Sequence, residues 1–174
     1  IGEISKKLKI APLEFVLDLL YEEDCKVSVI FFNMSEENLA RILKWDSVMI
    51  GSDSSLRSLK GVLNYGKPHP RGYGTFSRVI RKYVNETSIL SIEEAIYKMT
   101  GFPAQTLGLK DRGILKEGCF ADITIFDQET IAEQATFTSP HNYSTGINNV
   151  LVNGKLTIND GKHESVTNGV ILKK

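Results

Sequence analysis

The sequence contains few of the residues that build disulfide frameworks, metal sites or membrane spans. Among 174 residues there are two cysteines, three histidines and one tryptophan. Cys25 and Cys119 lie far apart and lack metal-finger spacing, so we expect reduced thiols in a cytoplasmic protein. No apolar run approaches the roughly 20 residues that a membrane-spanning helix needs. We therefore expect no membrane span, and we expect no signal peptide.

An excess of charge of one sign is also missing. The chain has 21 basic and 21 acidic residues. Proteins that bind nucleic acids or membrane surfaces usually carry a basic excess, so this balance argues against both partners. The length is sufficient to bury a real core. Because the first residue is Ile1 and not Met, we expect a processed chain or part of a longer one.

Hydrophobic periodicity predicts alternating helices and strands in the first part of the chain. An amphipathic helix is expected over Ala11–Asp24. The near-continuous apolar run Lys26–Phe32 is typical of a strand that is buried on both faces. Ser35 is expected to cap a helix that reaches about Lys44, and a further strand ends at Asp53. The order helix, strand, helix, strand indicates a parallel sheet with covering helices.

Residues 54–74 are expected to form a long loop, and loops of this length in compact domains are usually functional or disordered. Helices are then expected over Thr75–Asn85, over Ser91–Thr100 and after Pro103. Beyond residue 110 the pattern changes to short strands. Asn153-Gly154 predicts the turn of a hairpin, and Asp160-Gly161 predicts another turn. We therefore expect two parts, residues 1–110 and 111–174.

The residues best suited to chemistry lie on either side of the long loop. Asp53 is expected at the tip of a short strand, and carboxylates at strand ends are typical of barrel active sites. On its own, however, such an acid is most often a turn residue or a helix cap. Arg71 on its own would usually be a solvated charge. Pro68 and Pro70 restrict the backbone before it, and its planar guanidinium suits bidentate binding of a carboxylate.

Two neighbours complete this candidate site. His69 stands between the two prolines, and a lone histidine is more often a hydrogen-bonded structural residue than a metal ligand, because metal sites need several convergent donors. Tyr73 can line the same pocket or stack over the loop, and the residues alone leave both readings open.

Taken together, these segments resemble the amidohydrolase superfamily and, within it, the N-acyl-D-amino-acid deacylases, or D-aminoacylases. The superfamily likeness lies in Gly113–Asp127 and Val150–Gly154. The deacylase likeness is more specific and lies in these segments: Phe32–Glu36, Met49–Asp53, Lys67–Arg71, Gly74–Phe76, Lys98–Ala104 and Ala135–Phe137. The resemblance covers essentially the whole chain, but only the C-terminal part of such an enzyme.

The resemblance implies an α/β fold. Residues 1–110 would be the C-terminal segment of a TIM-like (β/α)8 metal-dependent hydrolase barrel, and residues 111–174 part of a small β-sandwich domain. The metal site of the family uses a His-x-His pair, a bridging cysteine or modified lysine, and two further histidines, none of which is present here. Asp53 maps onto the catalytic acid and metal ligand at the end of the eighth strand. Arg71 maps onto the arginine that binds the α-carboxylate, with Tyr73 and His69 also placed in the substrate-binding region.

The function that this resemblance implies is the zinc-dependent hydrolysis of N-acyl-D-amino acids, with Asp53 moving a proton between activated water and the leaving amine. Two alternatives remain open. The chain could be an inactive, metal-free remnant or interaction module, or the enzyme could act on cyclic amides. The expected partners are a small-molecule N-acyl amino acid and either a second copy of the chain or the missing N-terminal part. Nucleic acids and membranes are not expected as partners.

Overall fold

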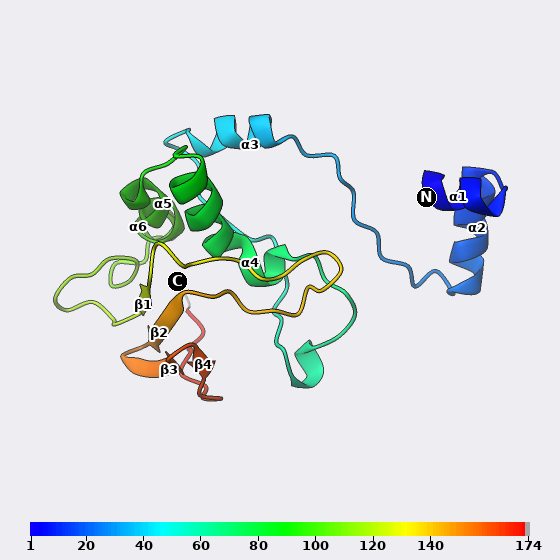
Figure 1. Ribbon diagram of the computed structural model, residues 1–174. Coiled ribbons are helices and arrows are strands. Elements are labelled where there is room, and N and C mark those ends of the chain that lie inside the picture. Colours follow the sequence, from blue (N-terminus) through cyan, green and yellow to red (C-terminus); the bar gives the residue numbers. More distant parts are fainter. Residues whose placement is uncertain (173–174) are drawn as a thin grey trace. The chain divides into compact units, whose positions relative to one another are not determined.

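The computed structural model describes residues 1–172 and divides the chain into two compact units, Ile1–Asn33 and Met34 onward (Figure 1). The first unit is a pair of helices, α1 (Gly2–Leu8) and α2 (Pro12–Glu22). Pro12 occupies the first position of α2, where its missing N–H leaves no hydrogen bond unmade. The helix predicted over Ala11–Asp24 is therefore confirmed.

The strand predicted over Lys26–Phe32 is wrong. This segment belongs to no helix and no strand. A strand needs a hydrogen-bonded neighbour, and none of the strand pairs formed within residues 1–172 includes it. The side chains of Val29 and Phe31 are consequently 58% and 74% exposed. The apolar run alone could not show whether a strand partner is present.

The second unit begins with a group of helices. Their bounds are α3 (Glu36–Leu43), the 3-10 turn η1 (Gly61–Leu63), α4 (Arg71–Arg78), the π-helix η2 (Val79–Glu86), α5 (Ile92–Met99) and α6 (Gly101–Leu107). Ser35 caps α3 as predicted, because its hydroxyl accepts a hydrogen bond from Asn38 N at 3.3 Å. Ser91 and Glu94 form a reciprocal capping box at the start of α5.

Two helix boundaries differ from the prediction. The helix expected over Thr75–Asn85 is longer, because α4 begins at Arg71, directly after Pro70, and continues into η2. The helix expected after Pro103 begins at Gly101. Pro103 lies in its first turn, where a missing N–H does not interrupt the hydrogen bonding of the helix. Both helices are therefore real, but each starts earlier than the sequence pattern indicated.

The core of the second unit lies between α3, η2 and α5. Its buried residues are Leu43, Val79, Tyr83, Val84, Leu90 and Ala95, and Ile50 packs at its edge. Lys98 of α5 is only 5% exposed, and its ammonium group donates to the backbone carbonyls of Trp45 and Val48. Ile50 N donates to Lys98 O at 3.1 Å. The backbone that leads to Asp53 is therefore held by α5.

This attachment explains why the strand predicted to end at Asp53 is also wrong. Residues 48–50 bond to the end of α5 and not to a neighbouring strand. The parallel sheet expected for the first part of the chain is therefore not present within residues 1–172. Because a parallel strand must pair with strands that follow or precede it at a distance, no local pattern could test whether such partners exist.

The tail forms a four-stranded antiparallel sheet in the order β1 (Ile123–Phe126), β2 (Ile147–Val152), β3 (Lys155–Asn159) and β4 (Lys162–His163). Asn153-Gly154 connects β2 to β3, and Asp160-Gly161 connects β3 to β4, so both predicted turns are confirmed. The mixed α and β content is likewise as expected. A boundary near residue 110 stays a prediction. Within residues 1–172, no helix is both long and apolar enough to cross a membrane.

Candidate active site

The structure brings Asp53 and Arg71 together as an ion pair. The Nη2 atom of Arg71 lies 3.0 Å from Oδ2 of Asp53. The Asp53 side chain is 90% exposed and that of Arg71 is 44% exposed, so both charged groups are open to solvent. Asp53 adopts a left-handed backbone conformation, with φ of 47°, which aspartate tolerates better than most residues. The two residues predicted for one site therefore share one surface.

Local structure explains how this pair is positioned. Asp53 follows the segment that α5 holds through Ile50. Arg71 is the first residue of α4, and the chain enters that helix through a turn in which Gly72 N donates to His69 O at 3.1 Å. Pro70, directly before Arg71, fixes its own φ angle. The guanidinium of Arg71 is thus carried by the start of a helix, which limits the backbone freedom expected of a loop residue.

His69 supports this turn. Its Nδ1 atom accepts a hydrogen bond from Arg71 N at 3.0 Å, and its ring meets Phe137 edge-on, with centroids 5.0 Å apart. Burial, together with the positive charge of Arg71, lowers the pKa of His69, so the imidazole is neutral at pH 7. This arrangement agrees with the structural role that the residues alone favoured. A contact between His69 and substrate stays a prediction.

Tyr73 lies against the long loop. Its hydroxyl donates to Ser58 O at 2.9 Å and lies 3.1 Å from Nδ1 of His141. The other ring nitrogen of His141 is 2.8 Å from Gly66 O. Burial raises the pKa of the Tyr73 phenol, so it stays protonated at pH 7. Tyr73 and His141 therefore hold both ends of the loop segment 58–66. A role for Tyr73 in binding substrate stays a prediction.

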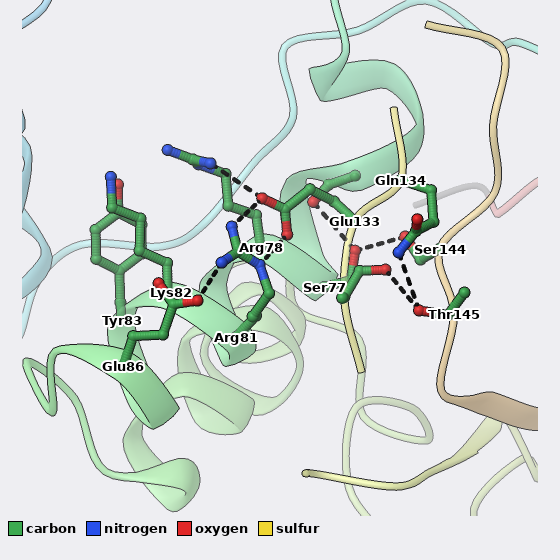
Figure 2. Close-up of polar contacts among 12 residues, drawn as sticks. Ser77, Arg78, Arg81, Lys82, Tyr83, Glu86, Glu133, Gln134, Ser144 and Thr145 are labelled. Carbon is green, nitrogen blue, oxygen red and sulfur yellow. Dashed lines mark hydrogen bonds and ion pairs between the residues drawn. The ribbon is translucent and has the colours of Figure 1, made fainter. Parts of the chain in front are cut away.

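A cluster of charged residues anchors the segment around residue 133 to the helix that carries Arg71 (Figure 2). Glu133 accepts hydrogen bonds from Nη1 of Arg78 at 3.0 Å and from Nε of Arg81 at 2.7 Å. The hydroxyls of Ser77 and Ser144 meet at 2.5 Å beside it. We call Glu133, Arg78 and Arg81 the Glu133 clamp. It attaches residues 133–144 along α4 and η2.

The carboxylate at the centre of the clamp is largely shielded from water. The Glu133 side chain is 11% exposed. Burial alone would raise the pKa of Glu133, but the hydrogen bonds from Arg81 and Arg78 lower it overall. Hydrogen bonding to Glu133 also raises the pKa of Arg81. All three groups are therefore ionised at pH 7, and each compensates the charge of another.

We expect Glu133→Gln to lower the free energy of unfolding by about 2–3 kcal/mol at pH 7. This is less than the roughly 3–5 kcal/mol seen for a fully buried pair, because the side chains of Arg78 and Arg81 are 41% and 30% exposed. The pKa of Glu133 is lower in the folded state than its ordinary 4.5. Its contribution is therefore present above pH 4.5 and is lost as the pH falls through the folded-state pKa.

Urea unfolding at pH 7 and at pH 3–4 measures both effects. Glu129→Gln is the matched control, since Glu129 is exposed and lies in the same segment. The Glu133 variant should be less stable than the control at pH 7, and the difference between the two should shrink at the acidic end. Equal stability of the two variants at pH 7 would show that the clamp contributes nothing.

Sequence reasoning missed most of the partners that hold this site. Glu133, His141 and Ser144 come from a segment that the sequence marked only by the family likeness of Ala135–Phe137. Their partners lie 52 to 75 residues earlier in the chain. No local periodicity or capping pattern predicts contacts between residues so far apart in the chain. Only the family likeness therefore indicated the correct segment.

The described residues do not form a metal site by themselves. Within residues 1–172, no three histidine, cysteine, aspartate or glutamate side chains converge to hold a metal ion. A catalytic zinc needs at least three protein ligands. Asp53, the one predicted ligand, pairs with Arg71. The arrangement alone can bind an anion and accept a proton, but it cannot coordinate zinc.

Comparisons with known proteins identify the family. The Amidohydrolase family matches residues 46–158. The N-acyl-D-glutamate deacylase of Alcaligenes xylosoxydans xylosoxydans is 42% identical over 130 residues, which are 75% of this chain and 25% of that protein. The D-aminoacylase of the same organism is 42% identical over 125 residues, 72% of this chain and 24% of that protein. The chain belongs to the amidohydrolase family, and the resemblance to D-aminoacylases is confirmed.

Solved structures agree. A crystal structure of D-aminoacylase superposes with a TM-score of 0.70 at 38% identity, over 78% of this chain and 27% of that one. The N-acyl-D-glutamate deacylase of Bordetella bronchiseptica gives a TM-score of 0.64 at 37% identity, over 78% of this chain and 28% of that one. The latter was solved with zinc and a phosphonate inhibitor that mimics the tetrahedral intermediate. The chain thus spans about a quarter of the length of the relatives it matches.

Proposed function

We propose that this chain is the C-terminal part of an enzyme that hydrolyses the amide bond of N-acyl-D-amino acids. The observation that carries the proposal is the ion pair of Asp53 and Arg71 on an exposed surface. It combines a group that can accept a proton with one that can bind a carboxylate. The similarity to deacylases at about 40% identity supports this reading.

The pair gives each residue a role. The planar fork of Arg71 suits the α-carboxylate of the substrate. A substrate carboxylate at Arg71 would compete with Asp53, and the Asp53 side chain would then be free to turn toward the scissile amide. There it would accept a proton from the attacking water and return it to the leaving amine. Both steps use groups that are exposed in the present structure.

We further infer the architecture of the whole enzyme. Residues 1–110 would complete a TIM-like barrel, and residues 111–174 would form part of a small β domain. The superposition on D-aminoacylase and the antiparallel sheet of the tail support this division. We also propose that the enzyme binds zinc, as the Bordetella bronchiseptica relative does. Asp53 is the candidate zinc ligand among the described residues, and the other ligands would come from the rest of the enzyme.

Assays of the full-length protein against paired N-acetyl-D- and N-acetyl-L-amino acids test the proposal. We expect release of acetate from the D-enantiomers only. Hydrolysis of neither enantiomer would contradict the proposed function. A second candidate, hydrolysis of a cyclic amide, is favoured by one observation: a dihydroorotase of Lactobacillus delbrueckii is 35% identical over 82 residues, or 47% of this chain. Dihydroorotate therefore belongs in the same panel of substrates.

We expect the 174-residue chain alone to be inactive and to self-associate. The described residues do not converge on a metal, so hydrolysis should be absent even with added zinc. Val29, Phe31 and Met34 lie within one extended stretch and are 58%, 74% and 76% exposed, and such segments favour pairing with another chain.

Light scattering over a concentration series and a zinc-supplemented assay check the two halves of this prediction. The variant Val29→Ser, Phe31→Ser is the matched control and should associate less. A compact monomer at every concentration would disprove the association, and deacylation by the chain alone would disprove the inactivity. Inactivity of the full-length protein as well would instead favour a metal-free interaction module.

A further inference from the structure

Arg57 is a half-buried arginine without an acidic partner among residues 1–172. Its Nη1 atom donates to Tyr65 O at 3.3 Å, and its guanidinium carbon lies 4.3 Å from the centre of the Tyr65 ring. Its Nε atom is buried and makes no hydrogen bond. Of the other five arginines, four pair with a carboxylate: Arg71 with Asp53, Arg78 and Arg81 with Glu133, and Arg112 with Asp122. The fifth, Arg41, is exposed.

This environment is incomplete for a positive charge. Burying a charged group is costly unless it is paired and hydrogen-bonded. The face of Tyr65 and its carbonyl offset part of the cost, but the Nε–H donor of Arg57 stays without a hydrogen bond. A guanidinium finds its best partner in a carboxylate, which accepts two parallel hydrogen bonds. The surroundings of Arg57 therefore lack an anion, and a ligand can supply it.

The same segment is depleted of acids in sequence. Residues 54–85 contain seven lysines and arginines and not one aspartate or glutamate, although the whole chain has equal numbers of both signs. Three of the seven, Arg57, Lys60 and Lys67, lie in the loop that precedes α4. The other four pair with acids outside the segment: Arg71 with Asp53, Arg78 and Arg81 with Glu133, and Lys82 with Glu36. Within residues 1–172, the three loop cations form no ion pair. The local balance therefore favours a negatively charged ligand.

Arg57 also lies beside the predicted substrate arginine. A Cβ atom placed on Gly72 would come within 2.8 Å of Ser54 Oγ and 3.5 Å of Arg57 Cγ. Gly72 directly follows Arg71, and Ser54 directly follows Asp53. The stem of Arg57 thus packs on the first turn of α4, and Tyr73 holds the neighbouring Ser58 through its carbonyl. Two arginines are therefore presented by one small region of the structure.

We propose that Arg57 binds a second carboxylate of the substrate, that of an acidic side chain, while Arg71 binds the α-carboxylate. The preferred substrates are then N-acyl-D-glutamate or N-acyl-D-aspartate. This inference rests on the proposed function and refines it. Sequence identity alone does not select the side chain, because the relatives that act on N-acyl-D-glutamate and N-acyl-D-aspartate and the D-aminoacylase are 42%, 40% and 42% identical to this chain.

The test compares N-acetyl-D-glutamate with its neutral isostere, N-acetyl-D-glutamine, in the full-length protein. The unaltered enzyme should prefer the glutamate. Arg57→Gln should lower kcat/KM for the glutamate by roughly 10- to 100-fold, as expected for loss of a charge-assisted hydrogen bond, and change kcat/KM for the glutamine by less than about threefold. Arg57→Lys, which keeps the charge, should recover part of the loss.

Arg41→Gln is the matched control, since Arg41 is an exposed arginine on α3. This variant should leave kcat/KM unchanged for both substrates. An equal loss for both substrates in Arg57→Gln would overturn the inference and make Arg57 a structural residue. An unaltered enzyme that cleaves other N-acyl-D-amino acids but does not prefer the acidic ones would overturn it too, while leaving the proposed function intact. If the enzyme hydrolyses no N-acyl-D-amino acid at all, both this inference and the proposed function are wrong.

Discussion

Asp53→Asn should lower kcat of the full-length protein on N-acyl-D-amino acids by about 10²–10⁴-fold, the range for loss of a general base. Asparagine keeps the shape of the side chain but cannot accept the proton from water. Because Asp53 is 90% exposed, its substitution should leave the thermal unfolding midpoint nearly unchanged. Turnover, bound zinc and the unfolding midpoint should be measured on the same preparation.

Asp46→Asn provides the matched control for this experiment. Asp46 is an exposed aspartate in the turn after α3, and its variant should keep normal turnover. If Asp53→Asn also keeps near-normal turnover, Asp53 is a turn residue, as it would most often be in the absence of the family likeness. If zinc is lost together with activity, Asp53 acts mainly as a ligand and not as a base.

Arg71→Ala should raise KM for N-acyl-D-amino acids by roughly 10- to 150-fold. A hydrogen bond to a charged group contributes about 1.5–3 kcal/mol, and a bidentate contact lies toward the upper end of this range. The amides and esters of the same compounds lack the α-carboxylate, so their KM values should change little. Steady-state kinetics on matched acid, amide and ester substrates separate carboxylate binding from other roles of Arg71.

The ion pair with Asp53 complicates this variant, because removing Arg71 also releases the carboxylate. Arg71→Lys keeps a positive charge beside Asp53 but lacks the planar fork. It should therefore restore the ion pair with Asp53 more fully than it restores binding of the substrate carboxylate. Lys67→Ala, an exposed cation in the same loop, is the control for a general loss of positive charge. Equal effects on acids and neutral analogues would make Arg71 a structural partner of Asp53.

Local signals in the sequence were sufficient for most of the helices and for the turns of the tail. The caps at Ser35 and Ser91 and the hairpin turn at Asn153-Gly154 all appear where they were predicted. Each of these features depends on hydrogen bonds and backbone angles within a few residues. The sequence pattern therefore contains nearly all of the information that such a feature needs.

Both strands expected before residue 54 were wrong because a strand depends on contacts with distant parts of a chain. Their apolar runs predicted burial between neighbouring strands, but strand formation depends on partners that lie elsewhere in a chain. Residues 48–50 instead bond to the end of α5, and the stretch around Val29 and Phe31 remains exposed. Hydrophobic pattern alone could not distinguish a paired strand from a segment that joins no sheet within residues 1–172.

The candidate site divides in the same way. The sequence by itself selected Asp53 and Arg71, because a strand-tip pattern, two prolines and the family likeness are all local in the chain. Only the tertiary structure decided that they form an ion pair, that Glu133 and His141 hold the surrounding segments, and that Arg57 is left without an acidic partner within residues 1–172. These contacts join residues that are far apart in sequence, and folding alone determines which charged groups meet and which remain available for a ligand.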